Sequence, residues 1–333
     1  MSRTSIPAAV IRCCYVLREA GHKAYPVGGC VRDLLLGRVP GDWDVTTSAR
    51  PELVQSLFPH TVPTGIRHGT ITVIEDEIRI EVTTFRKESE YSDSRHPDRV
   101  SFDTDLTGDL SRRDFTINAM AYGEDGQIID PYGGMVDLES RLIRAVGVPE
   151  QRFSEDALRI LRGIRFAAQL GFTVAQETMD AMKKSAALVD RVSPERIKTE
   201  MEKILVSPNP RWIALVVDMG ILNRFYTKWP ACDWEKIDVA DAVPIKRWKA
   251  FFELTRFPVS ALPIERAVRM AVLHPEREYI KALSLSGADL QRIGFSGELI
   301  GAAQRKLAEH IRLRPEDNEP ERLIKLLEQQ KDL

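Results

Sequence analysis

The sequence has little cysteine and little histidine. Four cysteines occur in 333 residues, and they form no CxxC pair. Cys13 and Cys14 are neighbours, which do not normally pair with each other, so neither a disulfide framework nor a cysteine zinc site is expected. The six histidines form no HExxH motif, which argues against a histidine-based metal hydrolase. We therefore expect a reduced, cytoplasmic protein.

Long apolar runs are also absent. No run approaches the roughly 18 to 20 residues that a membrane span needs. The first 22 residues, MSRTSIPAAVIRCCYVLREAGH, predict an amphipathic helix that ends at Gly21, with no sign of an export signal. We expect no membrane association.

An excess of basic residues is missing as well. Lysine and arginine total 47 against 49 acidic residues, for a net charge of −2. A nucleic-acid binder usually shows a basic excess, although local clusters can suffice because attraction to phosphate acts over roughly 8 to 10 Å. Charge alone therefore leaves nucleic-acid binding open.

The chain changes character along its length. Residues 22–130 mix short strand patterns, at 23–27, 43–47, 68–74 and 77–85, with short helices at 31–36 and 51–58. Within 77–85 apolar and polar residues alternate, as in a half-buried strand. Residues 86–99 are polar without periodicity and predict a mobile loop. From Phe153 onward the pattern is helical, with no convincing strand. This order predicts an α/β-type N-terminal domain followed by an all-α arm.

The stretch GGCVRDLLLGRVPGDWDV, residues 28–45, carries the first chemical signal. Asp42 and Asp44 are two apart in a strand pattern, so both carboxylates are expected on one face with Trp43 on the other. Two like charges so close favour a bound cation, and oxygen ligands without Cys or His favour Mg²⁺. If the 77–85 strand lies beside this one, Glu81 supplies a third carboxylate.

Gly28 and Gly29 stand between a strand and a helix. Glycines there let the backbone approach a ligand, and the first turn of the helix supplies amide donors for phosphate. Gly-Gly alone usually marks a turn, a lone DxD is a weak signal, and Arg32 with Asp33 is also readable as a simple ion pair. The ordered combination of strand, glycines, helix, DxD strand and later glutamate favours two-metal nucleotidyl transfer.

At this point the chain resembles the family of class II tRNA nucleotidyltransferases and bacterial poly(A) polymerases, within the polymerase-β-like superfamily. RRDFTINAMAY (112–122) is similar to the family's ribose-binding segment, and DPYGGMVDL (130–138) to its hinge. SEDALRILRGIRFAAQLGF (154–172) resembles the base-selecting helix, and SPERIKTEMEKIL (193–205) the helix that braces it. SGADLQRIGFSGELIGAAQRKL (286–307) is a weaker match to the tail.

The resemblance implies an α+β head with a mixed, polymerase-β-like sheet, followed by an all-α neck, body and tail. We expect the head at residues 1–147, the neck at 148–205, the body at 206–275 and the tail at 276–333. The stretch after Leu205 looks shorter than is usual for the family. The sequence assigns no oligomeric state.

The resemblance also implies roles for individual residues. Asp42 and Asp44 would hold two Mg²⁺ ions, with Glu81 as a further catalytic carboxylate. A larger set would bind the nucleotide: Gly28, Gly29, Arg32, Arg113, Asp114, Asn118, Asp156, Arg159 and Arg162. Within it, Asp114 would contact the ribose hydroxyls. In the tail, the candidate RNA contacts are Arg305, Lys306, Arg312 and Arg314, although a solvated basic face explains these four equally well.

Asp156 and Arg159 carry a physical argument of their own. Three residues apart on a helix, they would share one face. An ordinary surface ion pair is the alternative. A carboxylate that accepts and a guanidinium that donates match the amino group and ring acceptor of cytosine and adenine. Guanine and uracil present a carbonyl and an N–H instead, and each unpaired buried group costs about 1 to 3 kcal/mol. Arg162, one turn further on, would stack on the base or hold a phosphate, and Arg165 is readable as solvated.

The implied reaction is template-independent addition of CMP, CMP and AMP to the 3′ end of tRNA from CTP and ATP, with release of pyrophosphate. The loop at residues 85–102 looks full length, which argues against CC-only addition. The chain ends in LEQQKDL without the basic extension typical of poly(A) polymerases. CCA addition is therefore the first expectation, and A-addition beside a separate CC-adding enzyme is the second.

Overall fold

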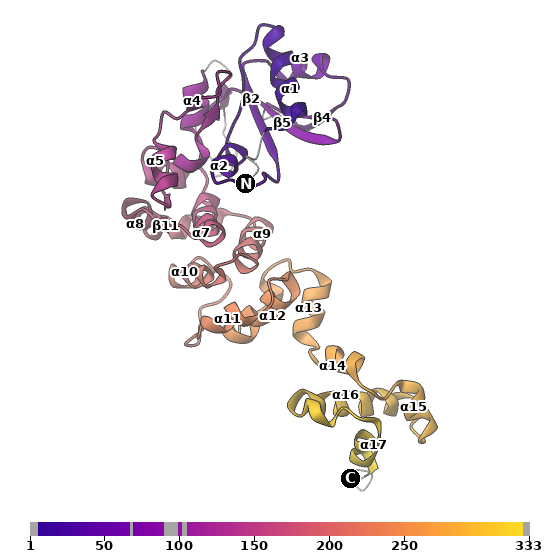
Figure 1. Cartoon of the computed structure of the whole chain (residues 1–333). Coiled ribbons are helices and arrows are strands. Elements are labelled where there is room, and N and C mark those ends of the chain that lie inside the picture. Colours follow the sequence, from indigo (N-terminus) through magenta and orange to yellow (C-terminus); the bar gives the residue numbers. More distant parts are fainter. Residues whose placement is uncertain (1–5, 67–68, 90–98, 102–104, 329–333) are drawn as a thin grey trace. The chain divides into compact units, whose positions relative to one another are not determined.

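The computed structural model describes residues 6–66, 69–89, 99–101 and 105–328. The chain forms two compact units, Met1–Thr227 and Lys228–Leu333, and each is described by itself. The first contains every strand of the described chain and the second is helical (Figure 1), in accord with the predicted fold class. The division into head, neck, body and tail stays a prediction.

A mixed five-stranded sheet, in the order β1-β2-β5-β4-β3, is the centre of the first unit. β2 and β5 are parallel neighbours, whereas the other neighbouring pairs are antiparallel. The strands are β1 (Ala24–Pro26), β2 (Trp43–Thr47), β3 (Thr61–Gly65), β4 (Thr70–Glu75) and β5 (Ile78–Thr84). Four of them were predicted. β3 was not, because it contains Pro63 and its residues are half-buried or exposed, so no apolar alternation marks it.

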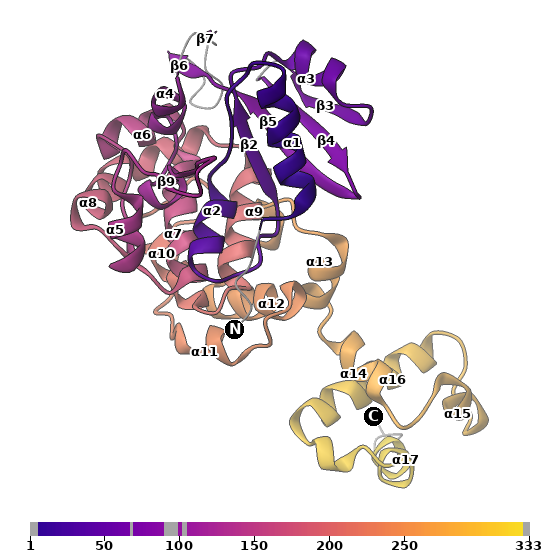
Figure 2. The same cartoon turned by 45° about the horizontal axis from the view of Figure 1, so that its top comes forward.

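Helices α1 (Ala8–Glu19) and α3 (Pro51–Leu57) pack against this sheet. Figure 2 shows α1 lying across β2 and β5. Apolar side chains of β2, β4 and β5, such as Trp43, Val45 and Ile80, share a core cluster with apolar residues of α1 and α3. Because side chains alternate along a strand, the polar residues between them face the other side of the sheet. That other side carries the candidate site.

The rest of the first unit is mainly helical. The helices are α2 (Gly29–Leu35), α4 (Leu106–Ser111), α5 (Gly134–Glu139), α6 (Pro149–Glu155), α7 (Leu158–Leu170), α8 (Gln176–Ser185), α9 (Pro194–Leu205) and α10 (Ile213–Asp218). A 3-10 turn, η2, spans Thr116–Asn118. Proline occupies the first turn of α3, α6 and α9, where its missing N–H costs no helical hydrogen bond. α7 ends at Gly171, whose φ of 70° is left-handed.

Three short strand pairs complete this unit: β6 (Lys87–Ser89) with β7 (Arg99–Ser101), β8 (Ala121–Tyr122) with β9 (Ile128–Ile129), and β10 (Leu142–Ile143) with β11 (Thr173–Val174). Two expectations were therefore wrong in part. The segment predicted as a loop at 86–99 contains β6 and the start of β7, while its residues 90–98 lie outside the described residues. The region after Phe153 contains β11, which is too short to show alternation.

The second unit consists of α11 (Glu235–Val239), α12 (Pro244–Thr255), α13 (Arg266–Leu273), α14 (Glu276–Ala282), α15 (Gly287–Arg292), α16 (Glu298–Leu313) and α17 (Pro320–Glu328). Stacked aromatic rings, Trp248 and Phe252 among them, pack within it, and leucines of α15, α16 and α17 form another apolar cluster. All four cysteines are free, as expected. None of the described helices combines the length and the apolar character that a bilayer span requires.

Candidate active site

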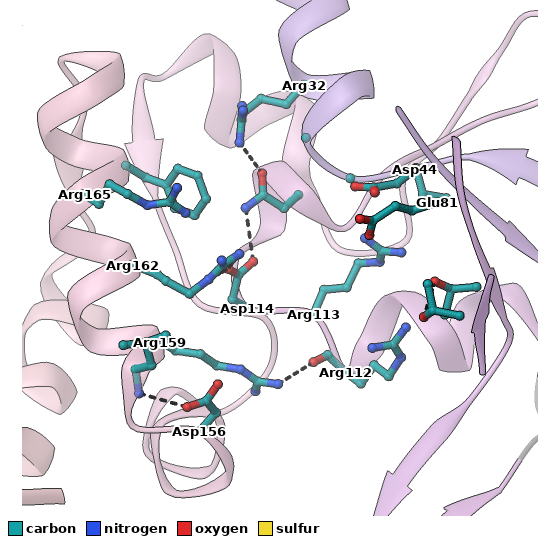
Figure 3. A pocket seen from close by; sticks show the side chains of 18 of the residues that line it. Arg32, Asp44, Glu81, Arg112, Arg113, Asp114, Asp156, Arg159, Arg162 and Arg165 are labelled. Carbon is teal, nitrogen blue, oxygen red and sulfur yellow. Dashed lines mark hydrogen bonds and ion pairs between the residues drawn. The ribbon is translucent and has the colours of Figure 1, made fainter. Parts of the chain in front are cut away.

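A cavity of about 520 Å³ lies in the first unit (Figure 3). Its described walls come from β2, β4, β5, the start of α2, the segment 112–118, the α6–α7 junction, α7 and the first turn of α9. Among the described residues, eight arginines line it: Arg32, Arg86, Arg112, Arg113, Arg159, Arg162, Arg165 and Arg196. Four acidic residues line it too: Asp44, Glu81, Asp114 and Asp156. The excess of positive charge suits an anionic ligand that comes with its own cation.

Asp44 and Glu81 face each other across the central strands. They are paired in the register of β2 and β5, which confirms the expected neighbourhood of these strands. Trp43 is buried on the opposite face, as expected. Asp42 differs from expectation: it precedes β2, is exposed, and is not among the residues that line the cavity. The chain turns into the strand only at Trp43, so the two-residue alternation does not extend back to Asp42.

The electrostatics of Asp44 fit a cation. The pKa of Asp44 is raised to about 6, mainly by burial and also by the negative charges of Glu81 and Asp42, against the opposing effect of Arg113. No three His, Cys, Asp or Glu side chains of the described residues converge as a ready metal cluster. The acidic groups around Asp44 nevertheless offer only oxygen ligands and repel one another, a combination that a hard divalent cation relieves.

Gly28 brings its backbone into the wall of this site. It precedes α2 with φ 77° and ψ −133°. A Cβ at this position would lie 2.8 Å from Nη1 of Arg113 and 3.6 Å from Oδ2 of Asp44. Glycine is therefore required here on two counts, its backbone conformation and the space that Arg113 takes. Gly29 follows as the first residue of α2 and also lines the cavity.

A chain of polar contacts crosses the cavity from α2 to α7 (Figure 3). Nη1 of Arg32 donates to Oδ1 of Asn118 at 2.7 Å, and Nδ2 of Asn118 donates to Oδ1 of Asp114 at 3.1 Å. Arg162 then pairs with the other oxygen of Asp114, through Nη2 at 2.6 Å. Asp114 is buried, which would raise its pKa, but Arg162 and Asn118 reverse this and hold the pKa well below its usual range. Arg32 also forms an ion pair with Asp33, which confirms the simpler interpretation of that pair, while its contact with the nucleotide stays a prediction.

Three arginines, one on α2 and two on α7, share an aromatic neighbour. The guanidiniums of Arg32, Arg162 and Arg165 lie 5.2, 5.5 and 4.3 Å from the ring centroid of Phe166. Arg165 is buried and forms an ion pair with Glu200, so its reading as a solvated residue was wrong. Arg162 lies one turn from Arg159 on α7, as expected.

Asp156 and Arg159 reach the same cavity by a different route from the one predicted. They do not share a helical face, because α6 ends at Glu155 and Asp156 is extended, with φ −141° and ψ 103°. Oδ1 of Asp156 accepts from the backbone N of Leu158 at 3.0 Å, and Oδ2 accepts from Nη2 of Arg196 at 2.8 Å. Nη1 of Arg159 donates to Oε2 of Glu155 at 2.7 Å. An aspartate that bonds backbone ahead of it competes with the helix, which explains the break.

Among the residues around the site that the sequence analysis did not single out are Arg196, which lines the cavity, and Asp109 and Glu155, which bind arginines of its wall. Asp109 precedes Arg112 and Arg113 by three and four positions, a spacing that does signal contact on a helix. Glu155 and Arg196 hold the side chains of Arg159 and Asp156, as above. Arg196 comes from α9, and no sequence pattern shows which residue 40 positions away it will contact.

The four tail candidates belong to the second unit. Arg305, Lys306 and Arg312 lie on α16, Arg314 follows it, and all four are exposed. They are not among the residues that line the cavity. Their RNA contacts stay a prediction.

Known proteins resemble this chain in both sequence and structure. A family described as the poly A polymerase head domain matches residues 24–144, and one described as a probable RNA- and SrmB-binding site of polymerase A matches residues 171–230. The CCA-adding enzyme of Anoxybacillus flavithermus is 51% identical over 274 residues, which are 81% of this chain and 65% of that protein. That of Limosilactobacillus reuteri is 38% identical over 78% of this chain and 71% of that protein.

Solved structures agree. The Bacillus stearothermophilus CCA-adding enzyme in complex with CTP superposes with a TM-score of 0.66 at 30% identity, covering 97% of each chain. A Thermotoga maritima CCA-adding enzyme complexed with tRNA gives a TM-score of 0.68 at 20% identity, a likeness of fold. It covers 98% of this chain and 97% of that one.

The sheet, its carboxylates and these matches define the class of the fold, which is that of the known CCA-adding enzymes. Within that class, the chain belongs to the family of CCA-adding enzymes and poly A polymerases. It spans 65% of the length of the first relative named above and 55% of that of the Bacillus pumilus CCA-adding enzyme, which is 48% identical over 223 residues.

Proposed function

We propose that this protein adds CMP, CMP and AMP to the 3′ end of tRNA, using CTP and ATP without a nucleic-acid template and releasing pyrophosphate. One observation carries the proposal: a single arginine-lined cavity contains both the carboxylate pair Asp44 and Glu81 and the candidate base readers Asp156 and Arg159. The named relatives, all CCA-adding enzymes, support it.

The base is selected by side chains in this proposal. The carboxylate of Asp156 accepts from the amino group of cytosine or adenine, and the guanidinium of Arg159 donates to the adjacent ring acceptor. Arg196 and the backbone N of Leu158 hold Asp156 in place, and Glu155 holds Arg159, so the order of acceptor and donor is fixed before the nucleotide enters. Guanine and uracil present the opposite order and leave buried groups unpaired.

The sugar and phosphates are held by the opposite wall. Asp114, oriented by Arg162 and Asn118, accepts from a ribose hydroxyl, which favours ribonucleotides. Arg32 and Arg113, beside Gly28 and Gly29, take the triphosphate. The Nε of Arg113 is buried without a hydrogen-bond partner in the described structure, so a donor is in place for an incoming phosphate.

The carboxylates position the metal in this proposal. Asp44, with Asp42 and Glu81 around it, would hold two Mg²⁺ ions. Such ions activate an attacking hydroxyl and neutralise leaving phosphates. The RNA 3′-hydroxyl attacks the α-phosphorus in line and releases its proton to solvent on the negatively charged Asp44 side of the cavity. The bond from that phosphorus to the bridging oxygen breaks, and its electron pair leaves with pyrophosphate. The arginine wall takes the charge of the departing pyrophosphate.

The remaining parts of the proposal concern RNA and location. Arg305, Lys306, Arg312 and Arg314 contact tRNA phosphates. The four free cysteines suit a reducing compartment, and we place the activity in the cytoplasm.

Two tRNA transcripts test the function, one without its CCA end and one ending in CC. Each is incubated with Mg²⁺ and CTP alone, ATP alone, or both, and the products are resolved at single-nucleotide length. With CTP and ATP together, we expect three added residues on the transcript without CCA and one on the transcript ending in CC. If only the CC-ended transcript is extended, A-addition replaces the proposal. A long ladder of added A would indicate poly(A) synthesis instead. No extension of either transcript would refute tRNA nucleotidyl transfer.

A further inference from the structure

Asp109 is a buried carboxylate that the proposed mechanism does not use. It lies on α4 with none of its surface exposed. Its Oδ1 accepts from Nη2 of Arg112 at 2.8 Å and from the backbone N of Arg86 at 3.3 Å. Its Oδ2 accepts from the hydroxyl of Thr46 at 3.1 Å and from Nη2 of Arg113 at 3.3 Å. One carboxylate thus connects α4 to β2, to the backbone of Arg86 just after β5, and to two arginine side chains.

This carboxylate stays charged in the fold. Burial by itself would raise the pKa of Asp109, but Arg112 and Arg113 outweigh burial and lower it. A buried anion bound to two guanidiniums fixes their positions far more firmly than solvent would, because moving either one exposes an uncompensated charge.

Both side-chain guanidinium partners of Asp109, Arg112 and Arg113, bear on the candidate active site. Nη1 of Arg113 fills the space beside Gly28, next to Asp44. The carbonyl of Arg112 accepts from Nη2 of Arg159 at 2.9 Å. Figure 3 shows this contact, with Arg113 directed toward Asp44 and Glu81. Asp109 itself is not among the residues that line the cavity, so it acts through its neighbours.

We propose that Asp109 is a positioning residue for nucleotide binding: it anchors Arg113 beside Asp44 on the phosphate side and Arg112 beneath Arg159 on the base side. The inference deepens the proposed function and rests on it. The two arginines are consecutive in the chain, so a single anion beneath them sets the spacing between the phosphate and base sides of the cavity.

The test uses Asp109→Asn, which keeps the shape of the side chain and removes its charge. Binding of CTP is measured by calorimetry without RNA, and kcat and KM for CTP are measured on the transcript without CCA, well below the melting temperature of each variant. We expect CTP affinity to fall about tenfold, the factor for one lost charge-assisted hydrogen bond. The double variant with Arg113→Gln should lose less CTP affinity than the two single losses multiplied together, because part of the effect of Asp109 passes through Arg113 and the rest through Arg112.

Asp137→Asn is the matched control. Asp137 is also buried in the first unit, accepts from the hydroxyl of Thr116 at 2.7 Å and pairs with Arg144, but is not among the residues that line the cavity. We expect it to lower stability and leave CTP affinity unchanged. If Asp109→Asn does not fold, Thr46→Val removes one hydrogen bond of Asp109 and should weaken CTP binding in the same direction.

The outcomes separate the two proposals. Asp109→Asn, or Thr46→Val in its place, with CTP affinity equal to wild type would overturn the positioning role, as would an equal loss in Asp137→Asn. A wild-type protein that binds CTP but extends no tRNA would refute the proposed function, while the comparison of CTP affinities would still decide the role of Asp109.

Discussion

Replacing Gly28 with alanine places a methyl group against the guanidinium of Arg113 in the candidate active site. The backbone of Gly28 has φ 77° and ψ −133°, a conformation that residues with a Cβ rarely adopt. The added methyl carbon would lie 2.8 Å from Nη1 of Arg113, below any normal contact distance. Nη2 of the same guanidinium is bonded to the buried Asp109, so Arg113 yields only by loosening that contact.

The magnitude follows from these two effects. Backbone strain of this kind costs about 1 to 3 kcal/mol, so the free energy of unfolding should fall by about 2 kcal/mol. Displacing Arg113 from Asp44 should weaken CTP binding by about tenfold or more, the worth of one charge-assisted contact. Stability is measured by urea denaturation and CTP binding by calorimetry.

Gly21→Ala is the control for strain alone. Gly21 also has a positive φ, 83°, but a Cβ there meets nothing within 4 Å. It should lose stability and bind CTP like wild type. The reasoning is refuted if Gly28→Ala binds CTP as wild type does, or if both variants weaken CTP binding to the same extent.

Three further predictions concern the acidic residues of this unit. Asp44→Asn should lower CMP incorporation by about a thousandfold, since metal stabilisation of the transition state is worth several kcal/mol; a rate near wild type in a primer-extension assay would contradict it. Asp156→Ala should reduce discrimination against UTP and GTP by about tenfold, the factor expected when one buried group loses its hydrogen-bond partner. If the ratio of kcat/KM for CTP to that for UTP or GTP is unchanged, base reading by Asp156 is ruled out. Asp109→Asn should lose about 3 kcal/mol at pH 7. Because the pKa of Asp109 is lowered in the folded state, its contribution is present above the unfolded value of about 3.9 and is lost as pH falls below it; a difference from wild type that persists undiminished at pH 3 would contradict this.

Four of the five strands of the central sheet and the pairing of Asp44 with Glu81 were predictable because they depend on local pattern. Alternation along 77–85 predicts which side chains of β5 face away from the core, and the structure places Glu81 on that face, opposite Asp44. The end of α1 near Gly21 was likewise readable, since Gly21 has the left-handed φ that ends helices.

The arrangement around Asp156 was not predictable by the same means. The residues from 154 onward read as one helix, and the break after Glu155 depends on a local bond of Asp156 together with a tertiary one. Asp156 exchanges a helical position for bonds to Leu158 and Arg196, and the latter comes from another helix. The contacts of Asp109 were not predictable from the sequence either, because Thr46 and Arg86 belong to segments that are distant from it in the chain.

The central claim is that the side chains of one cavity choose the nucleotides that extend tRNA. It is tested most directly by incubating a tRNA transcript without CCA with Mg²⁺ and equal concentrations of all four ribonucleoside triphosphates, and sequencing the product 3′ ends. The account predicts that ends reading CCA predominate for the wild type and that U and G appear in the Asp156→Ala variant. Wild-type ends of mixed sequence, with U and G as frequent as C and A, would contradict it.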